Sequence, residues 1–135
     1  TYYMYPQELE NRNVHFACTL GQNLPMEYDE KKRLSRLGEA DKDAAALRLR
    51  AARLVTGLSQ DGLGKAGGVK KAAVSNAEKG MAYPNRSVLL FLHREYRIDL
   101  NFMINGDFAQ LPGDVQDQLF QALLSLESET DRVQS

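Results

Sequence analysis

The chain has 135 residues, a net charge of −1 and 43% hydrophobic residues, which is typical of one globular domain with flanking segments. No apolar run reaches the roughly 18 residues that a membrane span needs, and no secretory signal is readable, so we expect no membrane partner. Cys18 is the only cysteine, and His15 and His93 are the only histidines, so no internal disulfide is possible, no metal site is expected, and we expect a reducing cytoplasm.

The first 40 residues give the least information. Residues 1–25 follow no clear period, although residues 14–20 (VHFACTL) have the composition of a short strand. Residues 28–37 suit a short charged helix. We interpret residues 1–40 as an N-terminal extension of unknown role.

The next segment predicts two helices. Residues 41–57 (DKDAAALRLRAARLVTG) are rich in alanine, leucine and arginine, which are good helix formers. Asp41 or Asp43 suits the start of this helix, and Gly57 suits its end. Ser59 has the residue type of a second N-cap, followed by residues 60–67.

Three further helices are expected before residue 107. The first covers residues 70–78, with Gly80 as its C-terminal cap, and a turn at residues 82–85 (AYPN) follows it. Residues 86–96 form an apolar helix, and residues 99–105 form a short one that ends at Gly106.

Residues 107–135 predict an amphipathic helix and an acidic tail. The helix carries one apolar stripe at helical spacing: Val115, Leu119, Ala122, Leu123 and Leu126. Phe120 and Leu124 widen the stripe beyond what one intramolecular face usually needs. The stripe packs either on its own domain or on a second chain, and the pattern leaves both open. The whole pattern predicts an all-α protein.

The glycines of residues 62–68 (GLGKAGG) raise a separate question. Gly62, Gly64 and Gly67 have the G-x-G-x-x-G spacing of a dinucleotide-binding loop. That loop follows a strand and opens a helix of a βαβ unit, whereas the residues before Gly62 are helical in pattern. We therefore expect no nucleotide cofactor and no enzyme. The glycines instead indicate two helices packed closely, with Gly68 in a turn that needs a positive φ.

Charge along the chain favours a nucleic-acid partner for this helical pair. Residues 42–80 carry eight basic and three acidic side chains, a net +5, while residues 107–135 carry −5. A positive block of this kind is typical of a phosphate-binding face, although a solvated helix surface has the same composition. Two helices joined by a short turn, the second opening on Lys70 and Lys71, form a helix-turn-helix.

Residues 49–106 resemble the lambda-repressor/Cro-type helix-turn-helix domain, also called the XRE family. The resemblance rests on four pieces at the family's spacing: LRAARLVTGLSQ (49–60), DGLGKAGGVK (61–70), VSNAEKG (74–80) and PNRSVLLFLHREYRIDLNFMING (84–106). It implies a five-helix DNA-binding domain, here with a flanking N-terminal segment and an extra C-terminal amphipathic helix. Gly64 and Gly67 depart from the usual alanines, Lys70 from the usual Ser/Thr cap, and Arg97 from a glycine.

The resemblance makes residues 70–78 the recognition helix, which enters the major groove of DNA. We expect its outward side chains to read bases: Lys71, Ala72, Ser75 and Asn76. Side chains that flank the groove are expected to bind phosphate: Gln60, Lys70, Lys79, Asn85 and Arg86. The resemblance further implies that Gln60 braces the recognition helix, and that Arg53 and Glu78 form a partly buried structural ion pair.

These residues predict a transcription regulator, of the phage-repressor kind, that binds an inverted-repeat operator as a homodimer in the cytoplasm, at the nucleoid. The side chains that could form the dimer interface are Phe91, Tyr96, Leu119, Phe120, Leu123 and Leu126. The alternative is an antitoxin or antiactivator that masks a protein partner through the N-terminal extension or the acidic tail. Basic residues on the recognition helix favour DNA.

Overall fold

The computed structural model describes residues 25–134. Within these residues the chain forms seven α-helices and no strand, so the all-α prediction is confirmed. Contacts divide the chain into two compact units, residues 1–30 and residues 31–135, and the second unit is described below. The strand expected at residues 14–20, and Cys18, lie outside the described residues. No helix between residues 25 and 134 is both long and apolar enough to cross a bilayer.

The helices are short except for α3 and α8. In chain order they are α2 (Tyr28–Ser35), α3 (Lys42–Thr56), α4 (Gln60–Gly67), α5 (Lys71–Glu78), α6 (Arg86–Tyr96), α7 (Leu100–Asn105) and α8 (Gly113–Gln134).

Local capping chemistry fixes several helix ends. Asp41 caps α3, because its carboxylate accepts a hydrogen bond from the Ala44 N–H at 3.2 Å. Ser59 caps α4 in the same way, with 2.9 Å between its hydroxyl oxygen and the Gly62 nitrogen. Gly57 ends α3 in the left-handed conformation, with φ +75°. The expected start and end of these helices are therefore confirmed.

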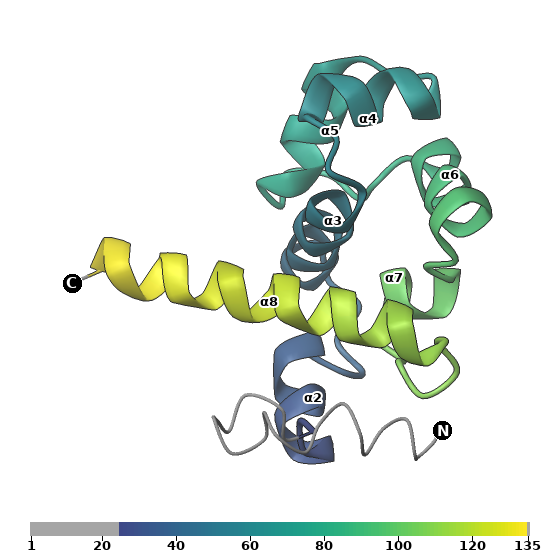
Figure 1. The fold of residues 1–135 in the computed structure, drawn as a ribbon. Coiled ribbons are helices and arrows are strands. Elements are labelled where there is room, and N and C mark those ends of the chain that lie inside the picture. The colour runs from purple at the N-terminus through teal and green to yellow at the C-terminus, as the bar shows by residue number, and fades with distance from the viewer. Residues whose placement is uncertain (1–24, 135) are drawn as a thin grey trace. The chain divides into compact units, whose positions relative to one another are not determined.

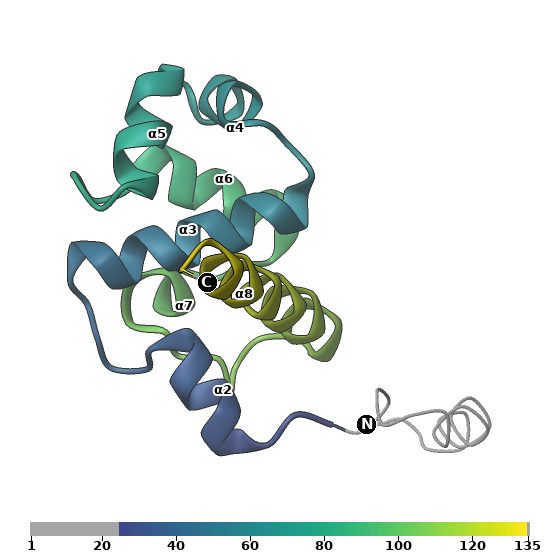
Figure 2. The ribbon, with the colours of Figure 1, turned by 90° about the vertical axis from the view of Figure 1, so that its left-hand side faces the viewer.

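Helix α3 is the centre of the unit formed by residues 31–135. Figure 1 views it nearly end-on, with α4 and α5 above it and α8 below it, and Figure 2 shows it running across the middle of this unit. It contacts α5, α7 and α8. Small side chains allow helices on several sides to approach, since Ala44, Ala51 and Ala52 are completely buried.

The apolar stripe of α8 packs on its own domain. Leu119, Phe120 and Leu123 are almost completely buried, and α8 makes extensive contact with α3. These three side chains belong to the core of the monomer, which corrects the expectation that they form a dimer interface. Burying each of them stabilises the fold by about 1.5–3 kcal/mol relative to leaving it exposed, so a second chain is not needed to cover them. Leu126, at the end of the stripe, is only half-buried.

Among residues 25–131, Arg48 has the largest side chain that is completely buried, and no pattern in the sequence predicts this. Its guanidinium donates to backbone carbonyl oxygens of three segments. The Nε atom donates to Ser35 at 3.0 Å, Nη1 to Ile104 at 3.0 Å, and Nη2 to both Arg36 and Glu39 at 2.7 Å. One side chain of α3 therefore holds the end of α2, the loop that follows it, and α7.

Gly106 leaves the space that Arg48 occupies. A Cβ atom there would lie 2.8 Å from Arg48 Nη2 and 2.8 Å from the Ser35 carbonyl oxygen, and the residue has φ +80°. Burial lowers the pKa of the Arg48 guanidinium from its usual value, and the like charge of Arg36 lowers it further. An arginine still keeps its proton at neutral pH, so the four carbonyls face a full positive charge.

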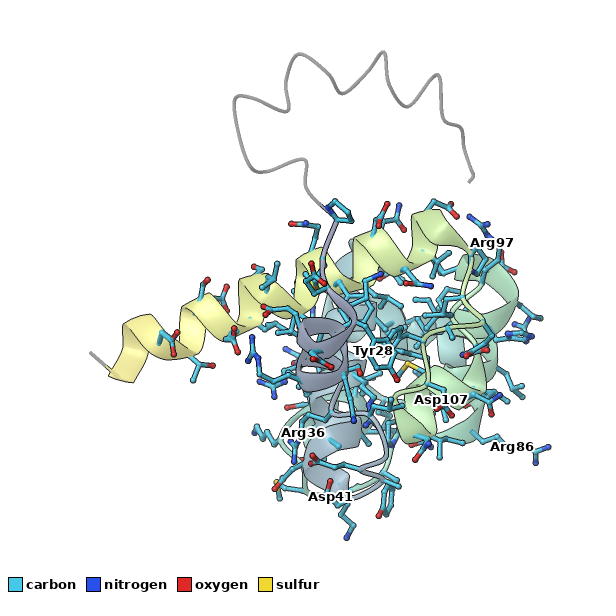
Figure 3. The ribbon with its side chains drawn as sticks, turned by 90° about the horizontal axis from the view of Figure 1, so that it is seen from below. Tyr28, Arg36, Asp41, Arg86, Arg97 and Asp107 are labelled. Atoms are coloured by element: carbon cyan, nitrogen blue, oxygen red, sulfur yellow. The ribbon has the colours of Figure 1, made fainter. Side chains whose placement is uncertain are left out.

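Arg97 ends α6 at the position where the family that the sequence resembles usually has glycine. It takes the left-handed conformation, with φ +58°. Its Nη2 atom lies 2.7 Å from Asp114 Oδ2 at the start of α8, and Figure 3 shows its side chain beside that end of the helix. The hydrogen bond from Arg97 holds the pKa of the Asp114 carboxyl below its usual value. An ion pair thus occupies the junction between α6 and α8.

Candidate nucleic-acid interface

Helices α4 and α5 are joined by a tight turn that depends on glycine. Gly68 has φ +76°, and the Val69 N–H donates to the Gly64 carbonyl oxygen at 2.8 Å. A Cβ atom on Gly64 would lie only 2.9 Å from the Val69 carbonyl oxygen. The backbone of the turn therefore approaches α4 more closely than alanine would allow.

Gly67 has the same role toward α6. A Cβ atom at this position would lie 2.7 Å from Val88 Cγ2 and 3.0 Å from Val88 Cα. All three glycines of the G-x-G-x-x-G spacing lie inside α4, and the segment before them is helix α3 rather than a strand. The spacing thus reflects close helix packing and not a phosphate-binding loop.

Helix α5 has a buried side and an exposed side. Val74, Ala77 and Glu78 are buried, whereas Lys71, Ala72 and Asn76 are exposed. Ser75 lies at the edge of the exposed side and is half-buried. The structure therefore places all four candidate base-reading residues on one helix, with Lys71, Ala72 and Asn76 facing solvent.

A polar cluster fixes α5 to α3 and α4. Arg53 of α3 pairs with Glu78 of α5 through both carboxylate oxygens, at 2.6 Å from Nε to Oε2 and 3.1 Å from Nη2 to Oε1. The Gln60 amide of α4 donates to Glu78 Oε1 at 3.0 Å. The Glu78 side chain is 5% exposed and that of Arg53 is 21% exposed, so solvent screens the pair only weakly. The cluster sets the orientation of the exposed side of α5.

The candidate phosphate-binding residues fall into two groups. Lys70, Lys79, Asn85 and Arg86 are exposed at the two ends of α5 and at the start of α6. Figure 3 shows Arg86 extending away from the helices. The side chain of Gln60 instead binds Glu78, so we assign it bracing, and a phosphate would meet only its backbone N–H or its remaining amide proton.

The loop between α5 and α6 adds two exposed apolar side chains, Met81 and Tyr83, that sequence reasoning missed. The Tyr83 hydroxyl donates to the Ala40 carbonyl oxygen at 3.2 Å, and Lys42 Nζ lies 5.8 Å from the centre of the Tyr83 ring. These contacts hold the loop against the start of α3. The signal in the sequence is the pair of large side chains in a turn that directly follows the recognition helix.

The six side chains suggested for a dimer interface do not form one surface. Phe91 and Tyr96 pack edge to face on α6, with 5.8 Å between ring centroids, and both are half-buried. Leu119, Phe120 and Leu123 are buried on α8. Of the set on α8, only Leu126 remains partly exposed.

Comparison with known proteins agrees with this geometry. A helix-turn-helix family model matches residues 49–103, the segment from the middle of α3 to α7 that contains α4, the turn and α5. Comparison with curated proteins and with solved structures found no match. Helix-turn-helix domains of this type bind DNA in transcription regulators. Residues 49–103 are therefore a helix-turn-helix domain of the lambda-repressor type, the XRE family.

Proposed function

We propose that the chain is a sequence-specific transcription regulator of the phage-repressor type, which binds an inverted repeat as a homodimer. One observation carries the proposal. Helix α5 exposes Lys71, Ala72 and Asn76 together, while the Arg53–Glu78 pair holds its other side in place. A rigidly held helix with a polar exposed side is what reading the major groove requires.

The exposed side chains suit different bases. Asn76 can bind adenine through two hydrogen bonds, and Lys71 can donate to the O6 and N7 atoms of guanine. The Ala72 methyl group can contact the methyl group of thymine, and the Ser75 hydroxyl can form a hydrogen bond with either base of a base pair. Each good base contact gives about 1–3 kcal/mol of discrimination.

The basic side chains around α5 supply affinity rather than sequence choice. Lys70, Lys79 and Arg86 are exposed and suit contacts to phosphate, and the Asn85 amide can add another. Each phosphate neutralised by a cation adds nearly one unit to the slope of log affinity against log salt concentration. Binding should therefore weaken steeply as salt concentration rises.

Two copies are needed because one domain of this size contacts too few bases to find one site in a genome. A two-fold dimer places two α5 helices in half-sites about one helical turn apart. The operator would then be an inverted repeat.

The test is selection of bound fragments from a random DNA pool with the purified full chain at near-physiological salt. We expect a palindromic site to be enriched by the wild-type protein and lost in the double variant Lys71→Ala/Asn76→Ala. Gln118→Ala/Gln121→Ala, on the exposed side of α8, is the matched control and should enrich the wild-type site. No enrichment by folded wild-type protein would overturn the proposal in favour of a protein partner.

A further inference from the structure

One side of α3 remains uncovered in the described part of the chain. In Figure 1, helices surround α3 on every side except the one between α5 and the far half of α8. Leu47, Arg50 and Leu54 lie on the side of α3 that is not buried, because they follow one another at spacings of three and four residues. Leu54 is 43% exposed, and Leu47 and Arg50 are half-buried. An exposed leucine therefore faces solvent on α3, with the half-buried Leu47 and Arg50 on the same side of the helix.

Helix α8 projects toward the same side. It has 22 residues, which corresponds to about 33 Å, and Figures 1 and 3 show its C-terminal half extending beyond α3. Leu126 lies where the core stripe of α8 ends and is half-buried, and Glu129, which follows it, is exposed. The apolar stripe of α8 therefore ends at a leucine that the monomer covers only in part.

Charge on the two elements is complementary. The only bond of the Arg50 guanidinium within residues 25–131 is a long one, 3.4 Å, to the carbonyl of Ala46 in its own helix. No carboxylate of these residues lies within ion-pair distance of it, and no cation pairs with Glu129 there either. Among the described side chains, α3 therefore carries an unpaired cation and the projecting half of α8 an unpaired anion.

We propose that two copies of the chain pair through this α3–α8 surface, defined by Leu47, Arg50, Leu54, Leu126 and Glu129. Each α8 lies across α3 of the other copy, so that Leu126 of one chain packs on Leu54 of the other and Glu129 pairs with Arg50. A two-fold axis makes both contacts twice, because the same patch serves both partners. The proposal names the dimer surface of the proposed regulator and rests on that function only for its two-fold symmetry.

The position of this surface suits the proposed operator. Figure 1 shows α5 on the same side of α3 as the projecting half of α8. Pairing through this side brings the two recognition helices close to the symmetry axis, as adjacent half-sites require. Ile104 of α7 is also exposed, by 54%, but α7 lies on another side of α3 (Figure 1).

Charge reversal tests the pairing most sharply. Sedimentation equilibrium of the full chain should give the mass of two 15.2-kDa chains. Arg50→Glu and Glu129→Arg should each raise the dimer dissociation constant at least about tenfold, since each places like charges opposite one another. The double variant Arg50→Glu/Glu129→Arg should restore most of the affinity, because it forms the reversed pair twice in each dimer.

Ile104→Asp is the control and should leave the dimer intact. Circular dichroism checks that each variant is folded, since Glu129 and Ile104 are exposed and Arg50 is half-buried. The proposal is overturned if the wild type stays monomeric, if the double variant is no better than the single ones, or if Ile104→Asp alone dissociates the dimer. A monomer that still enriches a DNA site would reject the pairing of two copies but not DNA reading by α5, and a dimer that enriches none would reject DNA reading but not the pairing.

Discussion

The two sides of α3 are built on different principles. Toward α4 and α5, the chain uses glycines at the turn, a few small apolar side chains and the Arg53–Glu78 pair. Toward α7 and α8, it buries large side chains such as Phe102, Leu119 and Phe120 around α3. The side that faces α5 fixes the orientation of the recognition helix, and the side that faces α8 buries the larger apolar side chains.

This difference predicts different sensitivities to substitution. On the α8 side, removing atoms or donors leaves cavities and unpaired carbonyls, which lowers the free energy of unfolding. On the α5 side, breaking the ion pair should disturb both stability and the orientation of the recognition helix. Substitutions on the α8 side should therefore change stability alone, whereas those in the ion pair should change stability and DNA binding together.

Arg48→Leu should have the largest effect. It removes the donors for four backbone carbonyls, each of which costs about 1–3 kcal/mol when it is buried without a partner, so we expect a loss of about 4 kcal/mol or more. Urea unfolding measures the change. The exposed Arg94→Leu on α6 is the control and should stay within about 0.5 kcal/mol of wild type. Equal effects from both would show that the carbonyl contacts contribute little.

Glu78→Gln should have an intermediate effect on stability and a larger relative effect on DNA binding. Removing one partner of a fully buried pair costs about 3–5 kcal/mol. Arg53 keeps part of its side chain in solvent, which reduces the expected loss to about 2 kcal/mol. Chemical denaturation measures this loss in the free energy of unfolding, with the exposed Glu95→Gln as the control. Wild-type stability in Glu78→Gln would contradict the bracing role.

Arg97→Gly should change stability least. Glycine relieves the left-handed backbone, worth about 1–2 kcal/mol, but it loses an exposed ion pair of about 0.2–1 kcal/mol and adds freedom to the unfolded chain. These contributions nearly cancel. A gain or loss of more than about 1.5 kcal/mol in the free energy of unfolding would contradict this balance.

The same variant has a pH signature. Because Arg97 lowers the pKa of Asp114 in the folded state, the pair stabilises the fold above the carboxyl's usual pKa and loses this contribution as pH falls. In Arg97→Gly the pKa of Asp114 should return toward its usual value, which titration of its carboxyl carbon by NMR measures. An unchanged pKa would assign the shift to another group.

Much of the fold was readable because its signals are local. Asp41, Ser59 and Gly57 act within one turn of their own positions, so the sequence alone places the ends of α3 and α4. The stripe on α8 shows that the helix buries a face but not against which partner. For Leu119 and Phe120, tertiary packing within the same chain determines this partner.

The parts of the site that the sequence did not reveal depend on distant backbone. Arg48 reads as one more cation in a basic segment, because its acceptors are carbonyls up to 56 residues away, which carry no residue-specific signal. For Gln60 the resemblance implied both a phosphate contact and bracing of the recognition helix, and its hydrogen bond to Glu78 identifies the bracing contact. The exposure of Lys71 and Asn76, in contrast, follows from helical period once Val74 and Ala77 are assigned to the core.

The central claim is that the exposed side of α5 reads base sequence. The most direct test measures the affinity of the wild type, Lys71→Ala and Asn76→Ala for the selected operator and for every single-base-pair change within it. We predict that the affinity of the wild type falls about 5- to 150-fold for each change at a contacted base pair. Each variant should lose that preference at its own position, once in each half-site, and keep it elsewhere. Unaltered preferences at every position in both variants would contradict the claim.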